Sequence, residues 1–201
     1  MSKLSYRQGA VAKVSEIQQH SDAGVVLAAG AGTRFGMPKV LADSGEWLGS
    51  VVAALREGGC ADVVVVLGAV VDGVTIPQSA SAVVAADWAD GLSASVRAGV
   101  LALEDADHEG VEFAVFLPVD TPDVNAAAVR RVLAAARGTG LARASYAGRP
   151  GHPVVIARRH WAALLDTLAG DEGAGPFLRS RDDVVMVDCA DLCSGADIDS
   201  R

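Results

Sequence analysis

Residues 25–39 read VVLAAGAGTRFGMPK. The first five form an apolar run short enough for a buried strand, and glycines follow at positions 30, 32 and 36. Glycine tolerates positive φ and lets the backbone approach a ligand closely, so the N–H groups of such a loop can converge on an anion. Arg34 and Lys39 add positive charges beside those groups. We therefore expect a strand followed by a phosphate-binding loop.

This loop differs from two well-known glycine-rich motifs. A P-loop has lysine directly after its last glycine, whereas Met37 and Pro38 intervene here. The dinucleotide fingerprint G-x-G-x-x-G is also missed by one residue, because Gly30, Gly32 and Gly36 are spaced G-x-G-x-x-x-G. A glycine-rich connector carrying two solvated cations is the alternative interpretation.

The composition limits the class of protein. The chain of 201 residues is long enough for one domain with a sizeable core, and 51% of it is hydrophobic. Its net charge of −8 argues against binding to nucleic acid or to an anionic membrane surface. The sequence contains no apolar run of about 20 residues that could span a bilayer and no signal peptide. We expect a soluble cytoplasmic protein, with its three cysteines reduced.

Apolar periodicity predicts an α/β protein. Runs of apolar residues predict strands over 25–29, 63–67, 83–85, 113–117, 141–146, 153–156 and 184–187. Amphipathic spacing predicts helices over 48–55, 93–103, 129–136, 161–168 and 176–179. Strands that alternate with helices pair in parallel, so we expect a three-layer Rossmann-like sandwich formed by a single domain over residues 23–201. Residues 1–22 are expected to be an N-terminal extension, in which Val11, Val14 and Ile17 could form one apolar helical stripe.

Within these elements, Ser93 is expected to cap the helix that follows it, and Asp171 the helix over 176–179.

Two strand ends carry residues suited to phosphate chemistry. Ligands of open α/β sheets bind beyond the carboxyl ends of the strands. The glycine-rich loop follows the first strand, and Asp120 follows the apolar run over 113–117. A carboxylate at such a place suits Mg²⁺, which binds one or two carboxylates together with phosphate oxygens. A cap or turn carboxylate beside Pro122 is the alternative for Asp120.

The loop resembles the signature L-A-(A/G)-G-x-S-x-R-M-G-x-P-K of the MobA-like nucleotidyltransferases, which include the enzymes that attach CMP or GMP to molybdopterin. Phe35 stands where methionine is usual, and Ala29 resembles the cytidylyl-transferring branch more than the guanylyl-transferring one. The resemblance implies nucleotide binding by residues of this loop. They are Leu27, Ala28, Ala29, Gly30, Ala31, Gly32, Thr33, Arg34 and Lys39.

Further segments extend the resemblance over residues 25–199. The segment 117–122 resembles the L-x-x-D-x-P element, which makes Asp120 the metal-binding aspartate. The segment 91–99 resembles G-x-S-x-S-(L/V)-x-x-G, which implies nucleotide contacts from its glycine and serines. These residues are Gly91, Ser93 and Ser95.

Two more segments concern the acceptor and the metal. The segment 151–154 resembles the G-H-P-V element beside the acceptor pocket, which makes Gly151 and His152 substrate-binding residues. The segment from Asp197 resembles the start of D-I-D-T-P-E-D-L, whose second acidic position, here Asp199, helps bind metal. The usual P-E-D-L helix does not follow, so how Asp199 is held is open.

The resemblance implies a Mg²⁺-dependent nucleotidyltransferase. It would transfer NMP from an NTP, with CTP favoured, to a phosphorylated acceptor, with molybdopterin as the leading candidate, and release pyrophosphate. Arg34, Lys39 and Asp120 would be catalytic, while Asp120 and Asp199 would hold the metal. Alternatives are transfer to a sugar phosphate or phospholactate, and a non-catalytic carrier of nucleotide or molybdenum cofactor that delivers it to a molybdoenzyme.

Overall fold

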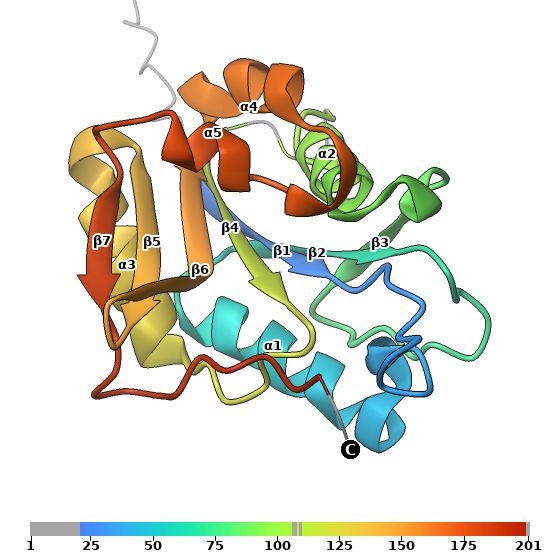
Figure 1. The fold of residues 1–201 in the computed structure, drawn as a ribbon. Helices are drawn as coiled ribbons and strands as arrows, with labels where there is room; N and C mark the ends of the chain where they lie inside the picture. Colours follow the sequence, from blue (N-terminus) through green and yellow to red (C-terminus); the bar gives the residue numbers. More distant parts are fainter. Residues whose placement is uncertain (1–20, 106–107, 109, 200–201) are drawn as a thin grey trace, which may run out of the picture.

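A seven-stranded sheet forms the centre of the computed structural model, which describes residues 21–105, 108 and 110–199. The strands lie in the order β3-β2-β1-β4-β6-β5-β7 (Figure 1). The expected stripe of Val11, Val14 and Ile17 lies outside the described residues. The first strand begins at Ser21, two residues before the expected start of the domain.

The observed elements match the predicted ones to within a few residues. The strands are β1 (Ser21–Leu27), β2 (Asp62–Leu67), β3 (Ser81–Val84), β4 (Val111–Pro118), β5 (Leu141–Tyr146), β6 (Arg149–Ala157) and β7 (Val185–Asp188). The α-helices are α1 (Glu46–Glu57), α2 (Leu92–Ala102), α3 (Ala126–Thr139), α4 (Trp161–Thr167) and α5 (Gly175–Arg179). Short 3₁₀ segments are η1 (Lys39–Gly45), η2 (Trp88–Asp90), η4 (Arg158–His160) and η5 (Gly170–Glu172).

Strand direction determines which loops share an edge of the sheet. Strand β1 is parallel to β2 and β4, β2 is parallel to β3, and β5 is parallel to β7. Strand β6 alone is antiparallel to its neighbours β4 and β5. Because Phe116 pairs with Val154, the amino end of β6 lies beside the carboxyl end of β4. The sheet is therefore mostly parallel, as predicted, and the segment around His152 reaches the edge that also carries Asp120.

Helices cover both faces of the sheet, as Figure 1 shows. Helices α1 and α3 contribute Leu48, Leu55 and Val132 to one core, whereas α2 and α4 contribute Val100 and Leu164 to the other. Burying each such side chain contributes about 1.5–3 kcal/mol. Successive side chains of the β-branched run in β2 pack alternately into the two cores. This explains why the sequence of β2 is continuously apolar rather than alternating between apolar and polar residues. Within the described residues, none of the helices combines the length and apolar character needed to cross a bilayer.

Two helix caps were predicted wrongly. Helix α2 begins at Leu92 with Gly91 at the N-cap, so Ser93 falls inside the first turn, where its side chain is buried. Helix α5 has Ala174 at its N-cap, and Asp171 lies three residues earlier, in η5. In both places the helix starts where a glycine-rich turn lets the chain change direction, and neither N-cap residue has a side chain that caps the helix.

Candidate active site

A cavity of about 560 Å³ opens at the carboxyl edge of the parallel strands. It is lined by the glycine-rich loop, the start of α2, the end of β4, the start of β6 and the C-terminal segment. The lining residues are Leu27, Ala28, Ala29, Gly30, Ala31, Gly32, Thr33, Arg34, Phe35, Lys39, Val40, Trp88, Ala89, Gly91, Leu92, Ser95, Pro118, Val119, Asp120, His152, Asp171, Asp197 and Asp199. The structure thus brings together every expected site residue except Ser93 and Gly151.

The glycine-rich loop is tied to the sheet at its start and folds back at its centre. The Ala28 amide donates to the Val66 carbonyl of β2 at 3.0 Å. Gly32 has a φ of +62°, and a Cβ there would lie 1.8 Å from the carbonyl oxygen of Met37. Only glycine fits this position, because an L side chain would be both strained and in collision with the backbone. The exposed Arg34 therefore projects from a turn whose shape depends on Gly32.

Phe35 fixes the loop to the start of α1. Its ring is buried and lies 5.3 Å, centroid to centroid, from the ring of Trp47. Trp47 is held in turn by a 2.6 Å hydrogen bond from its Nε1 to Asp43. The aromatic pair gives Phe35 a packing role at the position where the family signature has methionine.

Lys39 joins the two acidic residues expected to bind metal. Its Nζ donates to Asp120 Oδ2 at 2.7 Å and to Asp199 Oδ1 at 2.8 Å. The Lys39 side chain is 16% exposed and that of Asp120 21% exposed, whereas that of Asp199 is 62% exposed. Withdrawal from water disfavours the charged ammonium, but the two carboxylates outweigh it and raise the pKa of Lys39. The hydrogen bond and charge of Lys39, helped by Arg34, lower the pKa of Asp199.

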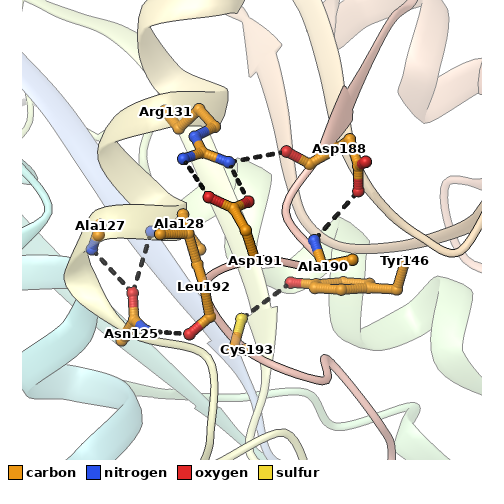
Figure 2. Close-up of polar contacts among 10 residues, drawn as sticks. All are labelled: Asn125, Ala127, Ala128, Arg131, Tyr146, Asp188, Ala190, Asp191, Leu192 and Cys193. Carbon is orange, nitrogen blue, oxygen red and sulfur yellow. Dashed lines mark hydrogen bonds and ion pairs between the residues drawn. The ribbon is translucent and has the colours of Figure 1, made fainter.

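The C-terminal strap, residues 189–199, runs from the end of β7 across the molecule towards α1 (Figure 1), and Asp199 at its end lines the cavity. Asn125 at the start of α3 donates from Nδ2 to the Leu192 carbonyl at 2.8 Å (Figure 2). Arg131 of α3 forms a two-pronged ion pair with Asp191 at 2.5 and 2.9 Å (Figure 2). These contacts hold the strap against α3.

The far end of the strap is tied to the loop after β4. The Asp123 carboxylate accepts hydrogen bonds from the Ser194 amide at 2.8 Å, the Ser194 hydroxyl at 2.5 Å and the Gly195 amide at 3.2 Å. The Ile198 amide donates to the Asp120 carbonyl at 3.0 Å. Asp199 therefore follows a residue whose backbone is already bonded to Asp120.

Asp120 and Asp199 line the cavity with carboxylate oxygens, which are the kind of ligand that a divalent cation binds. Asp120 and Asp199 each place an oxygen within hydrogen-bonding distance of the same ammonium nitrogen, so both carboxylates face one positive charge. Mg²⁺ is typically bound by one or two carboxylates, with substrate phosphates and water completing its shell. Among the described residues no group of three or more His, Cys, Asp or Glu is arranged to hold a metal. Asp197 also lines the cavity, and partial withdrawal from water and the Asp120 and Asp199 charges raise its pKa.

His152 supplies an uncharged ring to the part of the cavity formed by the start of β6. Its pKa is lowered to about 4, because the ring is withdrawn from water and faces the charge of Arg143. The imidazole is therefore neutral at about pH 7 and can donate or accept a hydrogen bond. Gly151 lies outside the cavity lining and packs against the ring of Tyr146 instead.

The two serines of α2 point to different places. Ser95 lines the cavity, whereas Ser93 lines a separate hollow together with Asp90 and Arg97. A serine two residues further along a helix lies on a different face, so both cannot serve one ligand. Ser93 is therefore not brought to the expected nucleotide site.

Sequence reasoning missed Trp88, Asp171 and Asp197 as lining residues. Asp171 reaches the cavity because η5 packs on the start of α2, where a Cβ on Gly91 would lie 2.3 Å from Asp171 Oδ1. An aspartate in a G-D-x-G-A turn and a tryptophan just before a G-x-S-x-S segment were the available signals.

Comparison with known proteins decides the family. Residues 24–184 match the model of the MobA-like NTP transferase domain. The chain belongs to this family. The family and the fold predicted from the sequence are both confirmed. Because the MobA-like family is a family of nucleotidyltransferases, the chain is assigned to this class of enzyme.

Individual relatives match most of the length of this MobA-like chain. It is 36% identical over 191 residues to nicotine blue oxidoreductase of Paenarthrobacter nicotinovorans, covering 88% of this chain and 91% of that protein. The crystal structure of Rv0371c from Mycobacterium tuberculosis H37Rv is 26% identical, with a TM-score of 0.73 over 90% of this chain and 94% of that one. A structure of Rv0371c in complex with manganese is also 26% identical, with a TM-score of 0.68 over 84% of this chain and 88% of that one.

Proposed function

We propose that this protein is a Mg²⁺-dependent nucleotidyltransferase that transfers NMP, with CMP favoured, to a phosphorylated acceptor, with molybdopterin as the leading candidate. The observation that carries the proposal is the placement of Lys39 between Asp120 and Asp199, beside a glycine-rich loop. In that arrangement, a divalent cation and a triphosphate would bind next to each other. The manganese complex of Rv0371c supports a divalent metal in a relative.

The nucleotide would lie along residues 27–34, with Gly91 and Ser95 approaching it from the start of α2. Loop amides, Arg34 and Lys39 would bind the β- and γ-phosphates, because that is where positive charge and N–H groups gather. Lys39 is within reach of both carboxylates and so of phosphates held there. Ser93 is left out of this assignment, since it lies outside the cavity.

The reaction needs positioning and charge stabilisation rather than a general base. An acceptor phosphate is already anionic, so its oxygen can attack the α-phosphorus directly. A new P–O bond forms there, the bond to the β-phosphate breaks, and pyrophosphate leaves. Lys39 and Arg34 would stabilise the charge that builds on the departing pyrophosphate. Mg²⁺ bound by Asp120 and Asp199 would neutralise part of the charge on the phosphate oxygens.

The acceptor would enter from the β6 side of the cavity. A neutral His152 ring suits a hydrogen bond to a polar acceptor group, whereas a charged ring would add another cation beside Arg34 and Lys39. Molybdopterin, a sugar phosphate and phospholactate all offer a phosphate nucleophile. A carrier that delivers nucleotide or molybdenum cofactor to a molybdoenzyme would use the same cavity without turnover.

Identity to nicotine blue oxidoreductase supports a second candidate function, hydride transfer to a small aromatic acceptor. A phosphate-binding loop suits the diphosphate of a reduced nicotinamide dinucleotide as well as it suits an NTP. The hydride would carry two electrons from the nicotinamide to the acceptor, which would take a proton from water. Trp88 and His152 line the cavity and offer flat surfaces to such an acceptor. This reaction needs no divalent metal.

Two parallel assays separate the candidates. The protein is incubated with Mg²⁺, each NTP and molybdopterin, a sugar phosphate or phospholactate, and pyrophosphate is measured. It is also incubated without metal with NADH or NADPH and nicotine blue, and loss of nicotinamide absorbance is followed. We expect pyrophosphate release in the first assay. Nicotinamide oxidation without pyrophosphate release would favour the second candidate, and nucleotide binding without either reaction would favour the carrier.

Asp120→Asn is the matched variant for both assays. It keeps the shape of the side chain but removes the metal-binding charge, so we expect pyrophosphate release to be abolished. Hydride transfer should be little affected. The free energy of unfolding should change by no more than about 1 kcal/mol, because Asp120 lies outside the cores. Transfer activity close to that of the wild type would remove Asp120 from the mechanism.

A further inference from the structure

Tyr146, the last residue of β5, lies where the acceptor side of the cavity meets the C-terminal strap. Its side chain is buried. A Cβ on Gly151 would lie 2.7 Å from Cδ2 and 2.8 Å from Cε2 of the Tyr146 ring. A Cβ on Gly195 of the strap would lie 2.1 Å from Cε2 and 2.2 Å from Cζ. Both glycines thus approach the same ring edge too closely for any side chain.

The Tyr146 hydroxyl adds a polar link between the same two segments. It donates to the carbonyl oxygen of His152 at 2.8 Å. Cys193 of the strap places its Sγ 3.4 Å from the same hydroxyl oxygen (Figure 2). Burial and the neighbouring Cys193 raise the pKa of Tyr146, so the hydroxyl keeps its proton and both contacts.

The strap has little freedom to move independently of this ring. Gly195 is held on the ring and also donates to Asp123, while Cys193 touches the hydroxyl. Only three residues separate Gly195 from Asp199, and that span is bonded through the Ile198 amide to the Asp120 carbonyl. A shift of Gly195 is therefore transmitted through only three residues to Asp199, the candidate metal ligand.

We propose that Tyr146 is a positioning residue that couples the placement of Asp199 to that of His152. Residues 151–152 and residues 193–195 both rest on one side chain, so displacing either segment displaces the other. The metal side and the acceptor side of the cavity then form one unit. This inference rests on the proposed function in naming these two sides, but its contacts are independent of which acceptor is used.

The test displaces one segment and observes the other. Gly195→Ala puts a methyl group against the Tyr146 ring and strains a backbone with a φ of +58°. Gly138→Ala is the matched control, because Gly138 lies in α3 and a methyl group added there would meet nothing within 4 Å. Two readouts are taken without any turnover. One is Mn²⁺ affinity by electron paramagnetic resonance, and the other is the position of the His152 ring resonances by NMR, assigned with His152→Gln.

We expect Gly195→Ala to weaken Mn²⁺ binding by about 10-fold or more, as for the loss of other groups that orient metal ligands. The His152 resonances should move in the same variant, and Gly138→Ala should change neither readout. Tyr146→Phe removes only the hydroxyl link and should move the His152 resonances with a smaller loss of Mn²⁺ affinity, about three- to tenfold. It serves as the test if Gly195→Ala does not fold.

The coupling is wrong if a displaced strap changes only one of the two readouts, or neither. Failure of the proposed function looks different, because the wild type would then bind Mn²⁺ and the variants would show the coupled changes, but the wild type would release no pyrophosphate with any phosphorylated acceptor.

Discussion

Lys39 is the residue at which the nucleotide loop and both candidate metal ligands meet. If it stabilises a departing pyrophosphate, its effect is concentrated in the transition state. Losing one such charge-assisted contact costs on the order of 2–4 kcal/mol, by analogy with lost oxyanion donors. We therefore expect Lys39→Ala to lower kcat by about 30- to 1000-fold, with a much smaller loss of CTP affinity.

Single-turnover rates and a direct binding constant for CTP·Mg²⁺ measure the two effects of Lys39→Ala separately. An equal loss of rate and affinity would contradict the catalytic role and would suit a carrier, which gains from Lys39 equally at every stage.

His152 makes the stability of the protein depend on pH. Its folded pKa is lowered from 6.5 to about 4, so between these values the unfolded chain binds more protons than the folded chain. The part of the free energy of unfolding that depends on a neutral His152 is fully present above about pH 6.5. It is lost as the pH falls towards about 4. The full shift corresponds to at most about 3 kcal/mol. His152→Gln should flatten this part of the curve in urea unfolding measured across the range.

Carboxylates titrate in the same pH range, so the free energy of unfolding will depend on pH in both proteins. The test is whether it falls less steeply with decreasing pH in His152→Gln than in the wild type. Parallel curves for wild type and His152→Gln would show that His152 has no such role.

At the scale of elements, the glycine-rich loop depends on its turn at Gly32. Gly32→Ala would force a methyl group against the Met37 carbonyl at a positive φ. We expect a loss of about 1–3 kcal/mol in the free energy of unfolding, together with the loss of nucleotide binding. Gly30→Ala is the control for the free energy of unfolding alone, because nothing lies within 4 Å of its Cβ position but Gly30 itself lines the cavity. Equal melting temperatures for the two variants would contradict this account of the loop.

The elements themselves could be predicted because each has a local signal. The β-branched run of β2 and the apolar spacing of α1 produce the same element wherever they are buried. The start of α2 was predicted wrongly because Ser93 is of a type that can cap a helix, whereas the turn at Gly91 sets the actual start.

Much of the candidate site could also be predicted, because Lys39 and Asp120 follow strands and His152 lies near the start of one, all at the same edge of the sheet. The strap could not, because residues 189–199 have no periodicity, and their path depends on distant partners such as Asn125, Arg131 and Tyr146. The role of Tyr146 could not be predicted from the sequence for the same reason, since its contacts with the strap join segments that are far apart in the sequence.

For the molecule as a whole, the choice of base is the most direct test of its place in the family. Ala29 is buried and lines the cavity at the position that distinguishes the two branches of the resemblance. We expect a higher kcat/KM with CTP than with GTP. CTP·Mg²⁺ should also raise the melting temperature more, because a ligand at about 100 times its Kd adds about 2.7 kcal/mol to stability. A clear preference for GTP in both measurements would refute the cytidylyl assignment.

Strand β6 runs against both its neighbours, and it is joined to β5 by a two-residue turn at Ala147 and Gly148. The candidate acceptor contact, His152, therefore lies in one strand of a hairpin, whereas the candidate nucleotide contacts lie in loops that lead into helices of the parallel half. A hairpin tip can be lengthened or exchanged without altering the strand order around it. Under the proposed function, we therefore expect changes near this hairpin to alter the choice of acceptor while leaving the glycine-rich loop and its nucleotide contacts in place.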